Sequence, residues 1–219
     1  MHSIVKNLLE VENNIKIYNN KLNINRNPKI IAVSKTFGMD KILPLIQYGH
    51  IDYGENKVQE AFEKWKEIKN KNSLIKLHMI GKLQTNKVKF AVQIFDFIHS
   101  VDSKKLAKKI ADEQSKINKK IKIFLQVNIG DEDQKSGINK NEINQLVSYS
   151  KDIGLDVIGL MCIPPLSIDP KDYFEEMQKL NKSLGFFELS MGMSSDFLEA
   201  VKYSSTYVRI GSSIFGKRS

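Results

Sequence analysis

Lys35 is the residue of this 219-residue chain whose type and position point most directly to chemistry. It follows the apolar run Ile30–Ser34, and this pattern predicts a lysine at the end of a buried strand. Beside apolar walls the ammonium form loses solvation, so the pKa of the amine falls and the amine becomes nucleophilic. Such an amine can form a Schiff base with a carbonyl compound, although a lysine at a strand end can also simply reach into solvent.

Two turns rich in small residues have the composition of a phosphate site. Ser194 and Ser195 are expected to open a helix, where backbone N–H groups and the helix dipole favour an anion. Gly211 and Ser212 form a second turn, in which glycine allows close approach and the hydroxyl donates a hydrogen bond. Each turn alone is a weak signal, but together they predict a site for one phosphate monoester. Pyridoxal 5′-phosphate (PLP) carries both a phosphate and an aldehyde that a lysine can bind.

Arg209 lies inside a predicted strand, two residues before the second turn. A buried arginine is costly unless it is paired, so its partner matters. One candidate is a carboxylate on an adjacent strand, such as that of Glu55, and the other is the pyridine nitrogen of a cofactor. Because arginine keeps its proton, it would donate to an unprotonated ring nitrogen, which weakens the ring as an electron sink.

Asn56, His78 and Met161 are the remaining candidates for the lining of such a pocket. Asn56 could reach the 3′-oxygen of the cofactor, or it could cap a helix expected at Lys57–Lys69. His78 could line the pocket or be a hydrogen-bonded core histidine, and Met161 could cover one face of the ring or simply pack. Cys162 has apolar neighbours and is expected to be a buried, inert thiol.

These residues follow strand-like segments that alternate with amphipathic helical ones. The expected strands are Ile30–Ser34, Ile51–Tyr53, Leu77–Ile80, Phe97–Ser100, Ile121–Asn128, Val157–Cys162, Phe187–Met191 and Val208–Ile210. The expected helices are Ile4–Asn20, Asp40–Gln47, Lys57–Lys69, Gln84–Gln93, Ser103–Asn118, Lys140–Asp152, Lys171–Leu184 and Ser195–Tyr203. Ser103, Asn139 and Asp40 are expected to be helix N-caps.

Alternation of eight strands with helices predicts a parallel sheet with right-handed crossovers. The most economical arrangement is a single (β/α)₈ TIM barrel over residues 1–219, with one extra N-terminal helix; a doubly wound open sheet is the alternative. Barrel enzymes carry their sites on loops after the strands, often with phosphate after strands seven and eight. Lys35, Asn56, Ser194 and Gly211 all fall on such loops, so the fold and the chemistry predict the same site.

Composition limits the class of protein. With 41% hydrophobic residues and no apolar run near the ~20 that span a bilayer, we expect a globular protein without a membrane segment or signal peptide. The single cysteine fits a reducing cytoplasm, and the four histidines lack the spacing of a metal site. The net charge of +9 comes mostly from dispersed lysines, so no specific nucleic-acid partner is expected.

Several motifs resemble those of the pyridoxal phosphate homeostasis protein family, in family order from residue 30 to residue 216. They are Ala32-Val33-Ser34-Lys35-Thr36, residues 53–60, residues 78–87, Gly159-Leu160-Met161, residues 189–196 and residues 208–216. The resemblance implies a barrel like the N-terminal domain of alanine racemase, of fold type III, without the C-terminal β domain. It implies that Lys35 holds PLP as a Schiff base. It also implies that Ser194, Gly211 and Ser212 contact the phosphate, and that Arg209 meets the pyridine nitrogen.

The resemblance and the residues together favour a PLP-binding protein of intracellular PLP homeostasis, a carrier without turnover. Its possible partners are PLP-dependent apoenzymes, and a monomer is expected because the barrel lacks a dimerising domain. The alternative is a PLP-dependent racemase or decarboxylase of fold type III. Racemisation by two bases needs a proton donor on each face of the substrate, and the domain that supplies the second base is not expected here.

Overall fold

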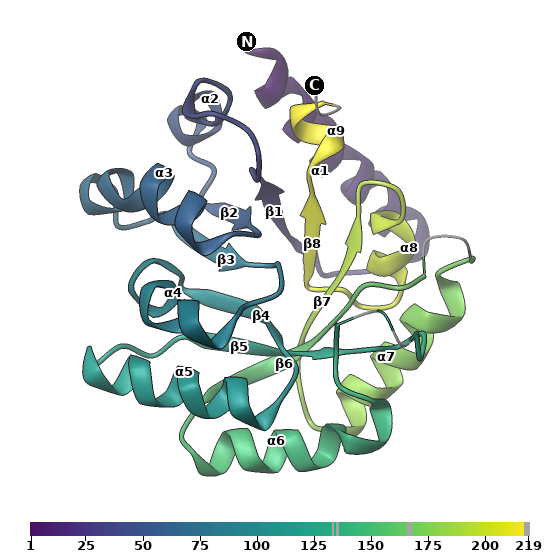
Figure 1. Ribbon diagram of the computed structural model, residues 1–219. Coiled ribbons are helices and arrows are strands. Elements are labelled where there is room, and N and C mark those ends of the chain that lie inside the picture. Colours follow the sequence, from purple (N-terminus) through teal and green to yellow (C-terminus); the bar gives the residue numbers. More distant parts are fainter. Residues whose placement is uncertain (133, 135, 166–167, 217–219) are drawn as a thin grey trace.

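The eight strands seen in the described part of the chain are all parallel and pair in chain order (Figure 1). The computed structural model describes residues 1–132, 134, 136–165 and 168–216. The ring closes because β1 (Lys29–Val33) pairs with β8 (Tyr207–Ile210), Ile31 lying opposite Arg209. The expected closed barrel is therefore confirmed, and the alternative of an open sheet is wrong.

The observed elements match the expected ones to within a few residues. The other strands are β2 (Asp52–Glu55), β3 (Lys76–Met79), β4 (Phe97–Val101), β5 (Lys122–Val127), β6 (Asp156–Cys162) and β7 (Glu188–Met193). The helices are α1 (Ser3–Leu22), α2 (Met39–Tyr48), α3 (Val58–Lys71), α4 (Val88–Ile94), α5 (Lys104–Lys116), α6 (Ile143–Asp152), α7 (Lys171–Ser183), α8 (Phe197–Lys202) and α9 (Ser212–Phe215). Two expected helices begin with a 3₁₀ turn, at Thr85–Lys87 and Lys140–Glu142. The single turn α9 was not predicted.

Two apolar layers hold the barrel together. The outer layer lies between the strands and the surrounding helices, and the inner one fills the barrel itself. The inner layer consists of Ile31, Phe97, Phe124, Met161 and Tyr207, all buried. Large side chains fill the interior of an eight-stranded barrel, so the ligand site must lie at its mouth.

Helix α1 covers the junction between the first and last strands. Figure 1 shows it beside α8 and α9, where the single turn of α9 is too short to cover β8. The apolar residues of α1 recur at helical spacing and are buried; they are Ile4, Val5, Leu8, Val11 and Ile15. Asn7 Nδ2 also donates to Ile214 O in α9, at 2.9 Å. The extra N-terminal helix is thus part of the barrel wall.

The helix caps test the finer sequence predictions. Ser103 caps α5 by accepting a hydrogen bond from Leu106 N at 3.3 Å, as predicted. Asn139 caps the 3₁₀ turn that precedes α6. The prediction for Asp40 is wrong, because α2 begins one residue earlier, at Met39, and Gly38 occupies the cap position. Within the described residues, no helix is long and apolar enough to cross a membrane.

Candidate functional site

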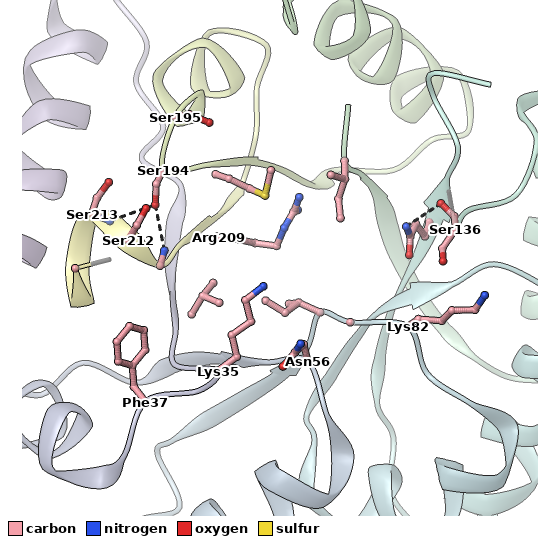
Figure 2. A pocket seen from close by; sticks show the side chains of 18 of the residues that line it. Lys35, Phe37, Asn56, Lys82, Ser136, Ser194, Ser195, Arg209, Ser212 and Ser213 are labelled. Carbon is pink, nitrogen blue, oxygen red and sulfur yellow. Dashed lines mark hydrogen bonds between the residues drawn. The ribbon is translucent and has the colours of Figure 1, made fainter. Parts of the chain in front are cut away.

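A cavity of about 960 Å³ opens at the carboxyl ends of the strands (Figure 2). Six of the eight predicted site residues line it: Lys35, Asn56, Ser194, Arg209, Gly211 and Ser212. Figure 2 shows the side chains of Lys35 and Arg209 extending into the same space, with the serines that follow β7 and β8 beside them. Residues from both ends of the sequence meet here because β1 and β8 are neighbours.

The segment that carries Lys35 is held in an unusual backbone conformation. The next residue, Thr36, has a φ of 69°, in the left-handed region that β-branched residues avoid. Its N–H donates to Glu60 Oε1 at 2.9 Å, and this carboxylate also pairs with Lys64 at 3.1 Å. Burial opposes ionisation of Glu60, but these bonds and the nearby lysines leave its pKa below the ordinary value. The charged carboxylate thus fixes the turn at Lys35.

Glu55 supports the same segment from inside the protein. Its side chain is fully buried, and Oε1 accepts from Ser34 Oγ at 2.7 Å, Lys64 Nζ at 3.0 Å and Trp65 Nε1 at 2.9 Å. Glu55 is not the partner of Arg209, and that prediction is wrong, because the carboxylate is held by Lys64 of helix α3. Buried carboxylates are tolerated when they are paired in this way.

Donors from two loops converge at the side of the cavity formed by β7 and β8. Ser194 Oγ accepts from the backbone N–H groups of Gly211 and Ser213, at 3.3 Å each (Figure 2). The hydroxyl of Ser212 lines the same corner. Ser194 and Ser195 do not open a helix as expected, since α8 begins only at Phe197. They lie instead in the turn after β7.

The turn after β7 is set by a glycine. Gly192 has a φ of 92°, which side chains rarely adopt, and a Cβ there would lie 2.6 Å from that of Ala200. The pairing of β7 with β8 shifts register between Ser190 and Met193, so the strand carries a bulge at this point. The bulge brings the end of β7, and with it Ser194, to the mouth of the barrel.

Arg209 is buried but has no carboxylate partner among the described residues. Its Nη1 donates to Ser190 Oγ at 2.7 Å, and its Nη2 donates to the carbonyl oxygen of Cys162 at 2.8 Å. Burial lowers the pKa of Arg209, yet a guanidinium keeps its proton in proteins. Burial also raises the pKa of the Cys162 thiol to about 12, which agrees with the expected inert cysteine.

Asn56 follows β2 and lies at the wall of the cavity. Its Oδ1 is buried and accepts no hydrogen bond from the described residues. The alternative role as a helix cap is not observed, because Lys57 holds the cap position of α3. Gly81 packs against the backbone of Asn56, and a Cβ at Gly81 would lie 2.5 Å from Asn56 O. An acceptor held rigidly in a cavity without a partner is a natural contact for a ligand.

The structure does not bring His78 or Met161 to the cavity lining. His78 is fully buried inside the barrel, where Nε2 lies 2.9 Å from Asp52 Oδ1 and Nδ1 lies 3.0 Å from His99 Nε2. Met161 belongs to the inner apolar layer, with Phe124 and Tyr207 among its neighbours. His78 is therefore a hydrogen-bonded core histidine and Met161 a packing residue, which were the alternatives to a place in the pocket.

Sequence reasoning missed several residues around the site. Ser213 belongs to the same run of small residues as Ser212, so its N–H could have been included. Gln126 lines the cavity from β5, and its polarity inside an apolar strand was a usable signal. Glu60 and Lys64 lie on the face of α3 toward β1, which no local pattern reveals. Within the described residues, no cluster of three or more His, Cys, Asp or Glu could hold a metal ion.

Comparison with known proteins places this chain in a family. The model of the alanine racemase N-terminal domain matches residues 7–219. The pyridoxal phosphate homeostasis protein of Pasteurella multocida is 36% identical over 201 residues, covering 87% of this chain and 86% of that protein. The chain belongs to the pyridoxal phosphate homeostasis protein family. The family that the sequence motifs predicted is therefore confirmed.

Two solved structures extend the comparison. PipY of Synechococcus elongatus with PLP bound is 32% identical, with a TM-score of 0.77, and the match covers 92% of this chain and 100% of PipY. The alanine racemase of Clostridium difficile 630 has a TM-score of 0.74 at 14% identity, and the match covers 99% of this chain and 57% of the racemase. The racemase likeness shows the fold alone, the expected alanine racemase-like barrel.

Proposed function

We propose that this protein binds PLP through Lys35 and takes part in intracellular PLP homeostasis as a carrier, without catalytic turnover. The observation that carries the proposal is the placement of Lys35, Arg209 and the Ser194 corner around one cavity (Figure 2). PLP, when bound, supplies an aldehyde that a lysine amine can bond covalently. A relative with PLP bound in its solved structure supports the same ligand.

The residues of the cavity fit the groups of PLP. The backbone N–H groups of Gly211 and Ser213, which donate to Ser194 Oγ in this structure, lie beside the hydroxyls of Ser194 and Ser212. These four donors can turn to a phosphate instead. The orphaned Oδ1 of Asn56 is an acceptor for the protonated 3′-oxygen. Lys35 supplies the amine, and Arg209 supplies donors for the ring nitrogen. Every polar edge of the ligand thus has a matching group.

Arg209 favours a carrier over an enzyme. A guanidinium can donate to the ring nitrogen but does not transfer its proton, so the ring stays a weak electron sink. A weak sink slows the removal of a proton or carboxylate from an amino acid, and a racemase or decarboxylase also needs acid–base groups on the substrate. The names of the relatives agree with homeostasis rather than with catalysis. We keep a fold type III racemase or decarboxylase as the competing function.

The remaining parts of the proposal concern partners and place. We propose that the protein delivers PLP to PLP-dependent apoenzymes and works as a monomer. A cytoplasmic location is consistent with the single, buried cysteine. Nucleic acid is not part of the proposal, because the three arginines of the chain are far apart in sequence.

The absorbance spectrum of the purified protein with PLP tests the covalent role of Lys35. The wild type is expected to show the visible band of a lysine-bound PLP, and Lys35→Arg is expected to lose it, because arginine keeps the positive charge but is not nucleophilic. Lys76→Ala is the control, since Lys76 is exposed at the opposite end of the barrel, and it should keep the band. A wild type without the band would overturn the site.

The same preparation distinguishes carrier from enzyme. The loaded protein should transfer PLP to an acceptor apoenzyme, which is measured as recovered activity of that enzyme. Incubation with amino acids should give no product at useful turnover. Sustained racemisation or decarboxylation that depends on Lys35 would contradict the carrier and favour the competing function.

A further inference from the structure

A row of polar side chains runs through the otherwise apolar interior of the barrel. It consists of Asp52 on β2, His78 on β3, His99 on β4, Ser190 on β7 and Arg209 on β8. The successive contacts are 2.9 Å, 3.0 Å, 2.9 Å and 2.7 Å, so no link is broken. All five residues are at most 8% exposed. The row ends at the guanidinium that lines the cavity.

The two ends of the row fix the direction of every hydrogen bond in it. A guanidinium can only donate and an ionised carboxylate can only accept, so with both histidine rings neutral each group between them must accept on one side and donate on the other. Ser190 accepts from Arg209 and therefore donates to His99 Nδ1. The proton of His99 must then be on Nε2.

The second histidine continues in the same sense. His99 Nε2–H donates to His78 Nδ1, and His78 Nε2–H donates to Asp52 Oδ1. The reverse tautomers would place an unprotonated His78 Nε2 against the carboxylate of Asp52, which leaves two acceptors facing each other. One arrangement of protons therefore satisfies the whole row.

The electrostatics agree with this arrangement. Burial lowers the pKa of His78, although the bond to Asp52 acts against it, and burial lowers the pKa of His99 well below its ordinary value. Burial opposes ionisation of Asp52, but the hydrogen bond from His78 leaves its pKa below the usual value. Two neutral rings thus separate the carboxylate from the guanidinium.

The rings are also held from the side. His78 stacks on Phe97 with ring centroids 4.2 Å apart, and His99 stacks on Phe124 at 4.3 Å. The ring of Tyr207 lies against both histidines. Both packing and hydrogen bonds restrain the two histidine rings. The rings can therefore impose a fixed orientation on Ser190.

We propose that this row positions Arg209 for the ring nitrogen of the cofactor, with Ser190 and His99 as positioning residues; the role rests on the proposed function. Ser190 and the carbonyl oxygen of Cys162 hold the guanidinium by two neutral acceptors. A carboxylate in their place would form an ion pair with the guanidinium, whereas the nearby carboxylate of Asp196 acts on it only through its charge. The guanidinium is therefore oriented toward the cavity by neutral acceptors, and among the described residues no carboxylate hydrogen-bonds to it.

The protonation pattern can be tested in the protein without cofactor. Nitrogen-15 NMR of histidine-labelled protein at neutral pH should show His78 and His99 as neutral rings with the proton on Nε2, assigned with His78→Phe and His99→Phe. Either ring as the Nδ1–H tautomer, or as a cation, would overturn the proposal. This result does not depend on whether PLP binds.

The positioning role is tested with two ligands, PLP and its analogue in which CH replaces the ring nitrogen. The wild type should bind PLP more tightly than the analogue by roughly tenfold, the worth of one hydrogen bond to a charged group. In Ser190→Ala and His99→Phe the ratio of the two affinities should fall toward one, while the affinity for the analogue changes less than about twofold. Ser190→Thr keeps the hydroxyl and should restore the preference.

A merely structural role predicts a different result. Equal losses of both ligands, with the preference intact, would overturn the positioning role, and so would a preference that survives in every variant. If Ser190→Ala does not fold, His99→Phe decides, because phenylalanine keeps the stack on Phe124. A wild type that binds neither ligand contradicts the proposed function. The NMR measurement of the histidine tautomers in the protein without cofactor still tests the hydrogen-bonded row in that case.

Discussion

At the scale of single residues, the strand end that carries Lys35 is held by a buried ion pair. Lys64 Nζ lies 3.0 Å from Glu55 Oε1 and also donates to the carbonyl oxygen of Ser34 at 3.1 Å. One lysine thus connects the core carboxylate to the backbone next to Lys35. Because Glu55 has no exposed surface, its charge is balanced by protein groups and not by water.

We expect Lys64→Ala to lower the free energy of unfolding by about 3–5 kcal/mol, because it leaves a buried carboxylate without its counter-ion. Urea unfolding followed by circular dichroism measures this. Lys71→Ala is the matched control, since Lys71 is exposed at the end of the same helix, and it should change stability by less than about 0.5 kcal/mol. Similar small losses for both variants would show that the pair does not stabilise the fold.

The sequence identified candidate site residues best where a residue type was out of place. A lysine closing an apolar strand and an arginine inside one were visible locally, and so were the small-residue turns at Ser194 and Gly211. His78 and Met161 were uncertain because a polar or soft side chain near a strand end can face the cavity or the interior. That choice depends on strand register and barrel tilt, which no local pattern encodes.

At the scale of elements, α1 replaces the helix that would otherwise follow β8. Leu8 is fully buried against the barrel, while Ile17 on the same helix is 58% exposed. We expect Leu8→Ala to cost about 2–5 kcal/mol of unfolding free energy, because it opens a cavity between α1 and the wall. Ile17→Ala should cost less than about 0.5 kcal/mol. Thermal unfolding of the two variants gives the comparison, and equal shifts would contradict a sealing role for α1.

The order of elements followed from periodicity alone, because parallel strands buried on both faces give short apolar runs between amphipathic helices. What periodicity could not give was the single turn α9 and the left-handed Thr36. A four-residue helix is only about one turn long, so its sequence shows no helical repeat of apolar residues. Thr36 owes its conformation to Glu60, which is distant in sequence.

At the scale of the whole molecule, buried histidines should make the fold sensitive to acid. Burial lowers the pKa values of His50, His78 and His99 from 6.5, so the unfolded chain binds protons that the folded chain does not. The free energy of unfolding should therefore fall as the pH drops below about 6.5, by up to about 1.4 kcal/mol per pH unit for each histidine.

Urea unfolding between pH 8 and pH 5, at constant ionic strength, measures this slope. His99→Phe should make the slope shallower, since one proton-binding site of the unfolded chain is gone. A stability that stays constant over this range would contradict the neutral, buried histidines.

The pairing of β1 with β8 also sets when the pocket can exist during synthesis. In the proposed site the amine of Lys35 follows the first strand, and the guanidinium and the proposed phosphate donors lie on or directly after the last two, so no partly made chain contains a complete site. A nascent barrel cannot sequester the aldehyde, and an incomplete one cannot retain it. Cofactor capture therefore follows ring closure and adds its binding free energy to the closed ring alone. Loading thus reports that the barrel has finished folding.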